Sequence, residues 1–132
     1  MNLIRAPRLD PGVPYAYAAV APPGSLIFTA GACPIDKHGD VVGIGDVTRQ
    51  TQQVMANLTE ALAAAGCGLT DVLKTTVYVA SSEHDDLLAA WDVVSASFGD
   101  HDAPSTLLGV GLLGYTGQLV EVEAVAAAAQ PR

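Results

Sequence analysis

The feature that most constrains the fold is a strict two-residue alternation near the end of the chain, in residues 119–127. There Val120, Val122 and Ala124 alternate with Glu121 and Glu123, and successive side chains of a β-strand point to opposite faces of a sheet. The strand therefore has one apolar face and one acidic face. A layer from elsewhere in the chain must cover the apolar face, so we expect helices on that side only.

Two segments have the helical periodicity that can supply this layer. Residues 47–65 contain apolar side chains at helical spacing, with Asp46 placed as the N-cap. In the second segment, Ser82 and Asp85 have the spacing of a capping box, and Gly99 is placed to end the helix. Its apolar stripe is expected to face the core and consists of Leu87, Leu88, Trp91, Val94 and Phe98.

Further strands are predicted over residues 25–31, 75–80 and 106–112, where β-branched, aliphatic and aromatic residues gather. The order of strands, helix, strand, helix and strands predicts an α+β domain with two helices on one face of a single sheet. The chain has 132 residues and no linker, repeat or low-complexity segment. We therefore expect one domain covering residues 1–132.

The composition limits the partners and the compartment. Half of the residues are hydrophobic and 15% are charged, so we expect apolar surface to be buried between identical subunits. The net charge of −8, with only six Lys and Arg, would repel a phosphate backbone, and nucleic acid is not expected as a partner. No apolar run is long enough to span a bilayer, and no export signal is evident, so a cytoplasmic protein with reduced cysteines and no membrane partner is predicted.

The acidic face of the last strand has two interpretations. Glu121 and Glu123 either lie in solvent or line a pocket at a subunit boundary, and the alternation by itself favours solvent. The three histidines of the chain are scattered without the spacing of metal ligands. No metal site is therefore predicted.

Six short segments, in order, resemble the RidA family of small enamine and imine deaminases, which is also called YjgF. They are Pro14-Tyr15, LIFTAGACP at 26–34, a helix at 51–66, DVLKTTVYVA at 71–80, a helix at 88–98 and LVEVEAVA at 119–126. The resemblance implies a chorismate-mutase-like fold and a homotrimer with pockets between its subunits. It also implies a small-molecule substrate and no metal or organic cofactor.

The resemblance implies roles for several residues. Glu121 matches a glutamate that positions or activates the attacking water, and Gly31 matches a glycine beside the pocket, where bare backbone lets a ligand come close. Tyr15 matches a pocket tyrosine, although a packed ring is an equally good interpretation. Cys33 lies two residues beyond Gly31 and could face the cleft, but a lone cysteine is more often an inert small apolar side chain.

The chain departs from the family where an arginine is expected to grip the substrate carboxylate. Aligned on Gly109-Val110, Ser105 takes the place of the arginine, whereas an ungapped alignment from the last strand puts Thr106 there. Asp92 stands where an asparagine is common, and Tyr115 lies in a turn from which it could close the cleft. These changes remove a positive charge, so efficient hydrolysis of a small imino acid is not expected.

The sequence thus predicts a RidA-like hydrolase in which Glu121 directs water at a C=N carbon. Its substrate would be neutral, or held through Ser105, Thr106 and Tyr115. The alternative is a catalytically silent trimer that binds a metabolite or a partner protein through the same cleft. An endoribonuclease activity, sometimes attached to the family, ranks last because the net charge is −8.

Overall fold

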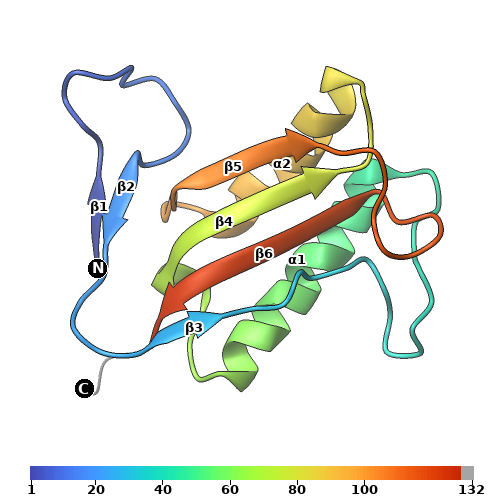
Figure 1. The fold of residues 1–132 in the computed structure, drawn as a ribbon, viewed down its shortest axis with the longest axis horizontal. Coiled ribbons are helices and arrows are strands. Elements are labelled where there is room, and N and C mark those ends of the chain that lie inside the picture. Colours follow the sequence, from blue (N-terminus) through green and yellow to red (C-terminus); the bar gives the residue numbers. More distant parts are fainter. Residues whose placement is uncertain (129–132) are drawn as a thin grey trace.

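The computed structural model describes residues 1–128 and consists of two layers. A β-sheet forms one layer, and two helices lie against one of its faces (Figure 1). The elements in chain order are β1 (Asn2–Ile4), β2 (Ala18–Val20), β3 (Leu26–Phe28), α1 (Val47–Ala64), a 3-10 turn (Leu69–Asp71), β4 (Val72–Val79), α2 (His84–Phe98), β5 (Ser105–Gly109) and β6 (Val120–Ala127). The predicted α+β architecture is confirmed. The prediction of one domain over residues 1–132 includes residues 129–132, which lie outside the described residues.

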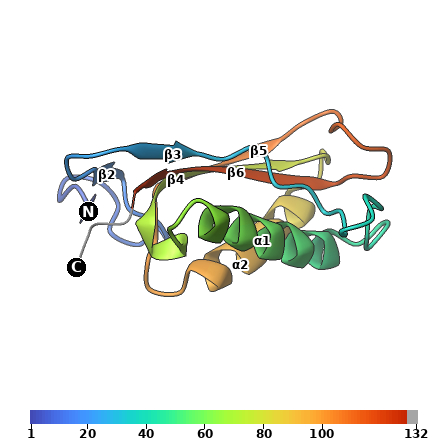
Figure 2. The same ribbon diagram turned by 90° about the horizontal axis from the view of Figure 1, so that it is seen from below.

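The sheet has the strand order β3-β6-β4-β5, in which β4 and β5 are parallel and the other pairs are antiparallel. A short ribbon of β1 and β2 forms a separate two-stranded sheet at the N-terminus. The sequence analysis did not predict this ribbon, because each of its strands is only three residues long and has no clear alternation. Figure 2 shows both helices beneath the sheet, with its other face free of helices.

The start of α1 was predicted correctly, and the start of α2 was not. The Asp46 side chain caps α1 by accepting a hydrogen bond from the backbone N–H of Arg49 at 3.0 Å. The predicted box of Ser82 and Asp85 does not form, since α2 begins after Glu83. A neighbouring pair takes its place: the Ser81 hydroxyl accepts from the Glu83 N–H at 3.0 Å and donates to Asp86 at 2.6 Å.

The core lies between the sheet and the two helices, as the alternation in β6 predicts. Val120 and Val122 are fully buried, and they pack in one cluster with Leu58 and Leu62 of α1. The predicted apolar stripe of α2 is wrong at Leu88, which is 55% exposed. Leu87 packs against the core, and Leu88, which is turned by about 100° from it on the helix, faces solvent.

The helix-free face of the sheet carries exposed apolar side chains. Phe28 on β3 is 73% exposed and Leu108 on β5 is 43% exposed, although both belong to strands of the sheet. Apolar side chains in such positions are typical of a surface that another chain covers. Within residues 1–128, no helix has the length and apolarity needed to cross a membrane.

Candidate active site

Glu121 lies on the helix-free face of the sheet, where its carboxylate is held by short contacts. Oε1 accepts a hydrogen bond from the Cys33 thiol at 3.1 Å and another from the Gln118 side-chain amide at 3.2 Å. The other oxygen lies against the backbone of Gly31, where an added Cβ atom would be only 2.4 Å from Oε2. Glu121 is thus half-buried. Its carboxylate can occupy this position only because residue 31 is a glycine and has no side chain.

Cys33 acts in this site as a hydrogen-bond donor. Its pKa is raised from 9.0 to about 11, chiefly by burial and then by the hydrogen bond and the negative charge of Glu121. The thiol therefore keeps its proton at neutral pH and is a poor nucleophile. The segment is anchored from below by Asn57 of α1, whose amide donates to the carbonyls of Cys33 and Ile35 at 2.8 Å each.

Gln118 is a site residue that the sequence analysis missed. Its side chain is 4% exposed, donates to Glu121, and accepts a hydrogen bond from the Tyr115 backbone N–H at 3.1 Å. A second buried glutamine, Gln50 of α1, supports the same turn by donating to the Gly117 carbonyl at 2.9 Å. The only sequence signal for Gln118 is its position three residues before Glu121.

Ser105 and Thr106, the two positions at which the family resemblance implies an arginine, lie on opposite faces of the sheet. Ser105 pairs in register with Thr75, which is 1% exposed on the helix side, and Thr75 donates a hydrogen bond to Ser105 at 2.6 Å. Thr106 points the other way and accepts from Lys74 Nζ at 2.6 Å. Thr106 therefore shares the helix-free face with Glu121, whereas the sheet separates Ser105 from that glutamate.

Glu121 and Thr106 share a face but do not meet within one chain. Thr106 pairs with Thr76, which pairs with Glu123, whereas Glu121 pairs with Tyr78. The two residues are thus two strands and two residues apart, a separation of about 12 Å from standard strand spacings. Within one chain, the two side chains are therefore too far apart to contact each other directly.

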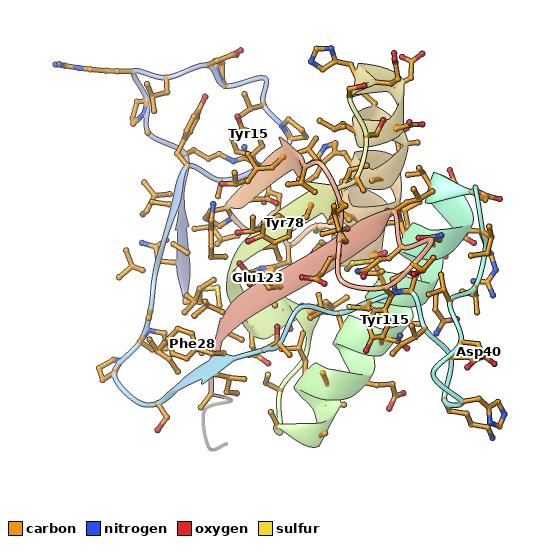
Figure 3. The ribbon with its side chains drawn as sticks, turned by 45° about the vertical axis from the view of Figure 1, so that its right-hand side comes forward. Tyr15, Phe28, Asp40, Tyr78, Tyr115 and Glu123 are labelled. Atoms are coloured by element: carbon orange, nitrogen blue, oxygen red, sulfur yellow. The ribbon has the colours of Figure 1, made fainter. Side chains whose placement is uncertain are left out.

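Glu123 is occupied by a hydrogen bond. The Tyr78 hydroxyl donates to its carboxylate at 2.7 Å, and Figure 3 shows the two side chains together over the sheet. This hydrogen bond is the main reason that the pKa of Tyr78 is raised. Glu123 is therefore a paired acid and not a freely solvated one.

Three other candidates make no hydrogen bond to Glu121 within the described residues. Tyr15 follows the loop after β1 and packs edge-on against Trp91 of α2, with ring centres 6.5 Å apart. Asp92 is exposed on α2. Tyr115 is 47% exposed in the turn before β6, where its backbone, not its ring, contacts Gln118.

The arrangement around Glu121 suits the handling of a proton on water. A carboxylate with one oxygen fixed by two donors keeps its second oxygen oriented, which is what a general base requires. Among residues 1–128, no three or more His, Cys, Asp or Glu side chains form a group that could hold a metal ion. The fixed carboxylate of Glu121 offers acid–base chemistry.

Comparison with known proteins places the chain in a family. The family model described as Endoribonuclease L-PSP matches residues 6–128. RutC family protein PH0854 of Pyrococcus horikoshii is 38% identical over 114 residues, which cover 86% of each chain. The solved structure of the Rid family protein YyfB from Yersinia pestis has a TM-score of 0.89 and 32% identity, and it covers 96% of this chain and 97% of its own.

Two similar proteins carry the names of enzymes. The 3-aminoacrylate deaminase RutC of Acinetobacter baylyi is 28% identical over 116 residues, 88% of each chain. The 2-iminobutanoate/2-iminopropanoate deaminase of Salmonella typhimurium is 32% identical over 80 residues, 61% of this chain and 60% of its own. The match of the family model and the likeness to the Rid structures show that the chain belongs to the Endoribonuclease L-PSP family, also called the RidA or YjgF family.

Proposed function

We propose that the chain is a RidA-type hydrolase that adds water to the C=N bond of a small imine in a cleft between subunits. The observation that carries the proposal is the Glu121 carboxylate, which Cys33 and Gln118 fix on the helix-free face. Glu121 takes a proton from water as the water oxygen bonds to the imine carbon, and it returns that proton to the nitrogen to give a carbinolamine. The same carboxylate then carries the hydroxyl proton of the carbinolamine to the nitrogen, and the C–N bond breaks to release ammonia and leave a carbonyl product.

The cleft requires a second copy of the chain. The separation of Glu121 from Thr106 leaves half of a site at each position, and exposed Phe28 and Leu108 lie on the same face. We therefore propose a homotrimer in which Glu121 of one subunit meets Thr106 of another. The names of the two deaminases similar to this chain support the reaction class.

The substrate preference is proposed to differ from that of an arginine-bearing site. Thr106 offers a hydroxyl in place of a guanidinium, and the nearest cation is Lys74, whose Nζ donates to that hydroxyl. An ammonium is a point charge and cannot form the two parallel hydrogen bonds that a guanidinium gives to a carboxylate. The substrate is therefore neutral, or is held weakly through Lys74, and Ser105 does not contact it.

The alternative is a trimer that binds a metabolite without converting it. The observation that favours this alternative is the lack of an arginine at both Ser105 and Thr106, the two positions where the family resemblance implies one that anchors the substrate. Cleavage of RNA, which the description of the family model suggests, is disfavoured by the net charge of −8.

The test is the rate of ammonia release from freshly generated 2-aminoacrylate and its imine, measured for the native protein and for Glu121→Gln and Thr106→Arg. Glu60→Gln is the matched control, because Glu60 is exposed on α1 and the charge change is the same. Activity in the native protein that Glu121→Gln abolishes supports the hydrolase. If the native protein is inactive and Thr106→Arg exceeds its rate by at least about tenfold, the scaffold is competent and its native substrate is a different one. No activity in any variant supports the binding protein.

A further inference from the structure

The carboxylate of Glu121 is held by two segments that are far apart in the chain. Cys33 lies in the segment after β3 and Gln118 in the turn before β6, and both donate to Oε1. Within residues 1–128, these two side chains supply the side-chain hydrogen bonds of the carboxylate. The orientation of Glu121 therefore depends on whatever fixes the two segments.

The helix α1 fixes both segments through two amide side chains. Gln50 and Asn57 lie about two helical turns apart on α1, so they project from the same side of the helix. Gln50 is fully buried and serves the turn of Gln118. It donates to the Gly117 carbonyl at 2.9 Å and accepts from the Leu119 N–H at 2.7 Å. Asn57 serves the other segment.

The amide group of Asn57 is held in a single orientation. Its Nδ2 donates to the carbonyls of Cys33 and Ile35, at 2.8 Å each. Its Oδ1 accepts from Nε2 of Gln53, one turn earlier on α1, at 3.0 Å. Because the oxygen is occupied by Gln53, both N–H groups of Asn57 are directed at the backbone of the segment.

Pairing with β6 does not extend to Cys33. Ala32 forms a bridge with Val122 of β6, and its N–H donates to the Val122 carbonyl at 2.7 Å. Cys33 is the next residue and lies beyond this bridge, where its carbonyl accepts from Asn57. The position of the Cys33 thiol against Glu121 is therefore set at the point where α1 takes over from the sheet.

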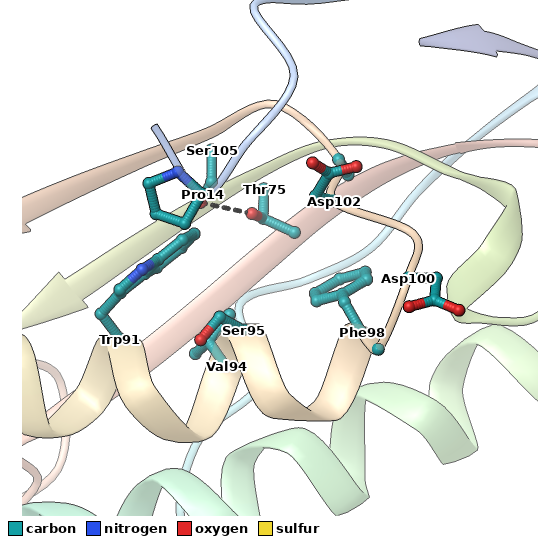
Figure 4. A pocket seen from close by; sticks show the side chains of 11 residues that line it. Pro14, Thr75, Trp91, Val94, Ser95, Phe98, Asp100, Asp102 and Ser105 are labelled. Atoms are coloured by element: carbon teal, nitrogen blue, oxygen red, sulfur yellow. Dashed lines mark hydrogen bonds between the residues drawn. The ribbon is translucent and has the colours of Figure 1, made fainter. Parts of the chain in front are cut away.

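The second helix, α2, faces other groups. Figure 4 shows its Trp91 and Ser95 side chains near the hydrogen bond between Thr75 and Ser105, on the helix side of the sheet. Among the described residues, α2 supplies no hydrogen bond to Glu121 or to its two donors. The carboxylate thus depends on α1 and not on α2.

We propose that Asn57 is a positioning residue for the hydrolysis: it fixes Cys33 so that the thiol holds Oε1 of Glu121, and Gln53 orients Asn57. The inference rests on the proposed function, because the position of the carboxylate affects a rate only if Glu121 moves the proton. A catalytic group misplaced by about 1 Å loses on the order of 100-fold in rate. Gln118 still holds Oε1 when the thiol contact is lost, so a smaller loss of about tenfold is expected.

The kinetic test is a double-mutant cycle of Asn57→Ala and Cys33→Ala, in which ammonia release is measured over a range of imine concentrations. Each single variant is expected to lower kcat about tenfold and to change KM by less than about twofold, since neither side chain is placed to bind the substrate. Because Asn57 acts through the thiol, the double variant should be as fast as Cys33→Ala.

Two more variants on α1 complete the kinetic test. Gln53→Ala leaves the N–H donors of Asn57 in place and should cost less than Asn57→Ala. Gln52→Ala is the matched control, because it removes an exposed amide from the same helix, and it should keep full activity. Alanine favours the helical conformation, so α1 is expected to persist in all of these variants, which circular dichroism checks.

A second readout needs no activity. In a Cys67→Ser background, NMR of isotope-labelled cysteine follows the ionisation of the Cys33 thiol alone. Burial and the contact with Glu121 raise the pKa of Cys33 to about 11. Asn57→Ala should lower this pKa because it releases the thiol from Glu121, whereas Gln52→Ala should leave it unchanged.

The outcomes separate this inference from the proposed function. A native protein that releases no ammonia, or a fully active Glu121→Gln, contradicts the hydrolase, and the titration alone then judges the role of Asn57. The inference is overturned if the kcat losses of the two single variants multiply to about 100-fold in the double variant. It is also overturned if Gln52→Ala is as slow as Asn57→Ala, or if Asn57→Ala leaves the pKa of Cys33 unchanged.

Discussion

Replacing Gly31 by alanine should disable the site without unfolding the protein. The new Cβ atom would lie 2.4 Å from Oε2 of Glu121, whereas ordinary contacts begin at 3.4 Å, so the carboxylate must move by at least 1.0 Å (3.4 − 2.4). The clash is with a side chain that can swing away, and stability should change little. A misplacement of about 1 Å in a catalytic group costs on the order of 100-fold in rate.

The assay is ammonia release under saturating imine, with the melting temperature measured on the same samples. Gly111→Ala is the matched control, because a Cβ atom at Gly111 would meet open space. We expect Gly31→Ala to lose activity as Glu121→Gln does, while Gly111→Ala keeps it. Full activity in Gly31→Ala, with Glu121→Gln inactive, would refute the argument that the close approach of Gly31 positions the carboxylate.

Three further outcomes follow from the contacts described above. In a Cys67→Ser background, ultraviolet titration should give a Cys33 pKa near 11, and Glu121→Gln should lower it, since burial and Glu121 raise this pKa. Because the raised pKa belongs to the folded state, the stability that it contributes is present below pH 9.0 and is lost as the pH rises to about 11, which urea unfolding at several pH values can follow. The fully buried amide of Gln50 hydrogen-bonds to the carbonyls of Gly43 and Gly117 and to the N–H of Leu119. Gln50→Ala would leave these three backbone groups without that partner. Its free energy of unfolding should fall by roughly 2–4 kcal/mol in urea, and a change below about 0.5 kcal/mol would contradict the role given to Gln50. Phe28→Asp should convert the proposed homotrimer to monomers in light scattering while the helical signal persists, and an unchanged mass would show that the exposed Phe28 face is not the interface.

The sequence predicted the layers well because periodicity reports burial directly. The alternation in β6 and the spacing in α1 both follow from which side faces the core, and both were confirmed in the structure. The capping of α2 was wrong by one residue, since Ser81 and Ser82 offer the same chemistry and only the backbone path selects between them. The ribbon of β1 and β2 was missed because three-residue strands carry too short a pattern.

The candidate site was less predictable, because its contacts join segments far apart in the chain. The proximity of Glu121 to Gly31 follows from the family resemblance, but the roles of Gln118 and Cys33 depend on hydrogen bonds that no spacing encodes. Which of Ser105 and Thr106 shares a face with Glu121 depends on the register of β5 against β4. Strand register depends on tertiary packing, and a shift of one residue exchanges the two faces.

The edge strand β5 places consecutive residues, Ser105 and Thr106, on opposite surfaces. Point mutations at these two positions can therefore be selected separately, so a lineage can alter what one surface recognises without compromising the other. A one-residue insertion or deletion within β5 itself has the opposite effect, because it would exchange the inward and outward side chains on one side of the change. Divergence within the family is accordingly expected to proceed by substitution in β5, with the length of residues 105–109 held constant.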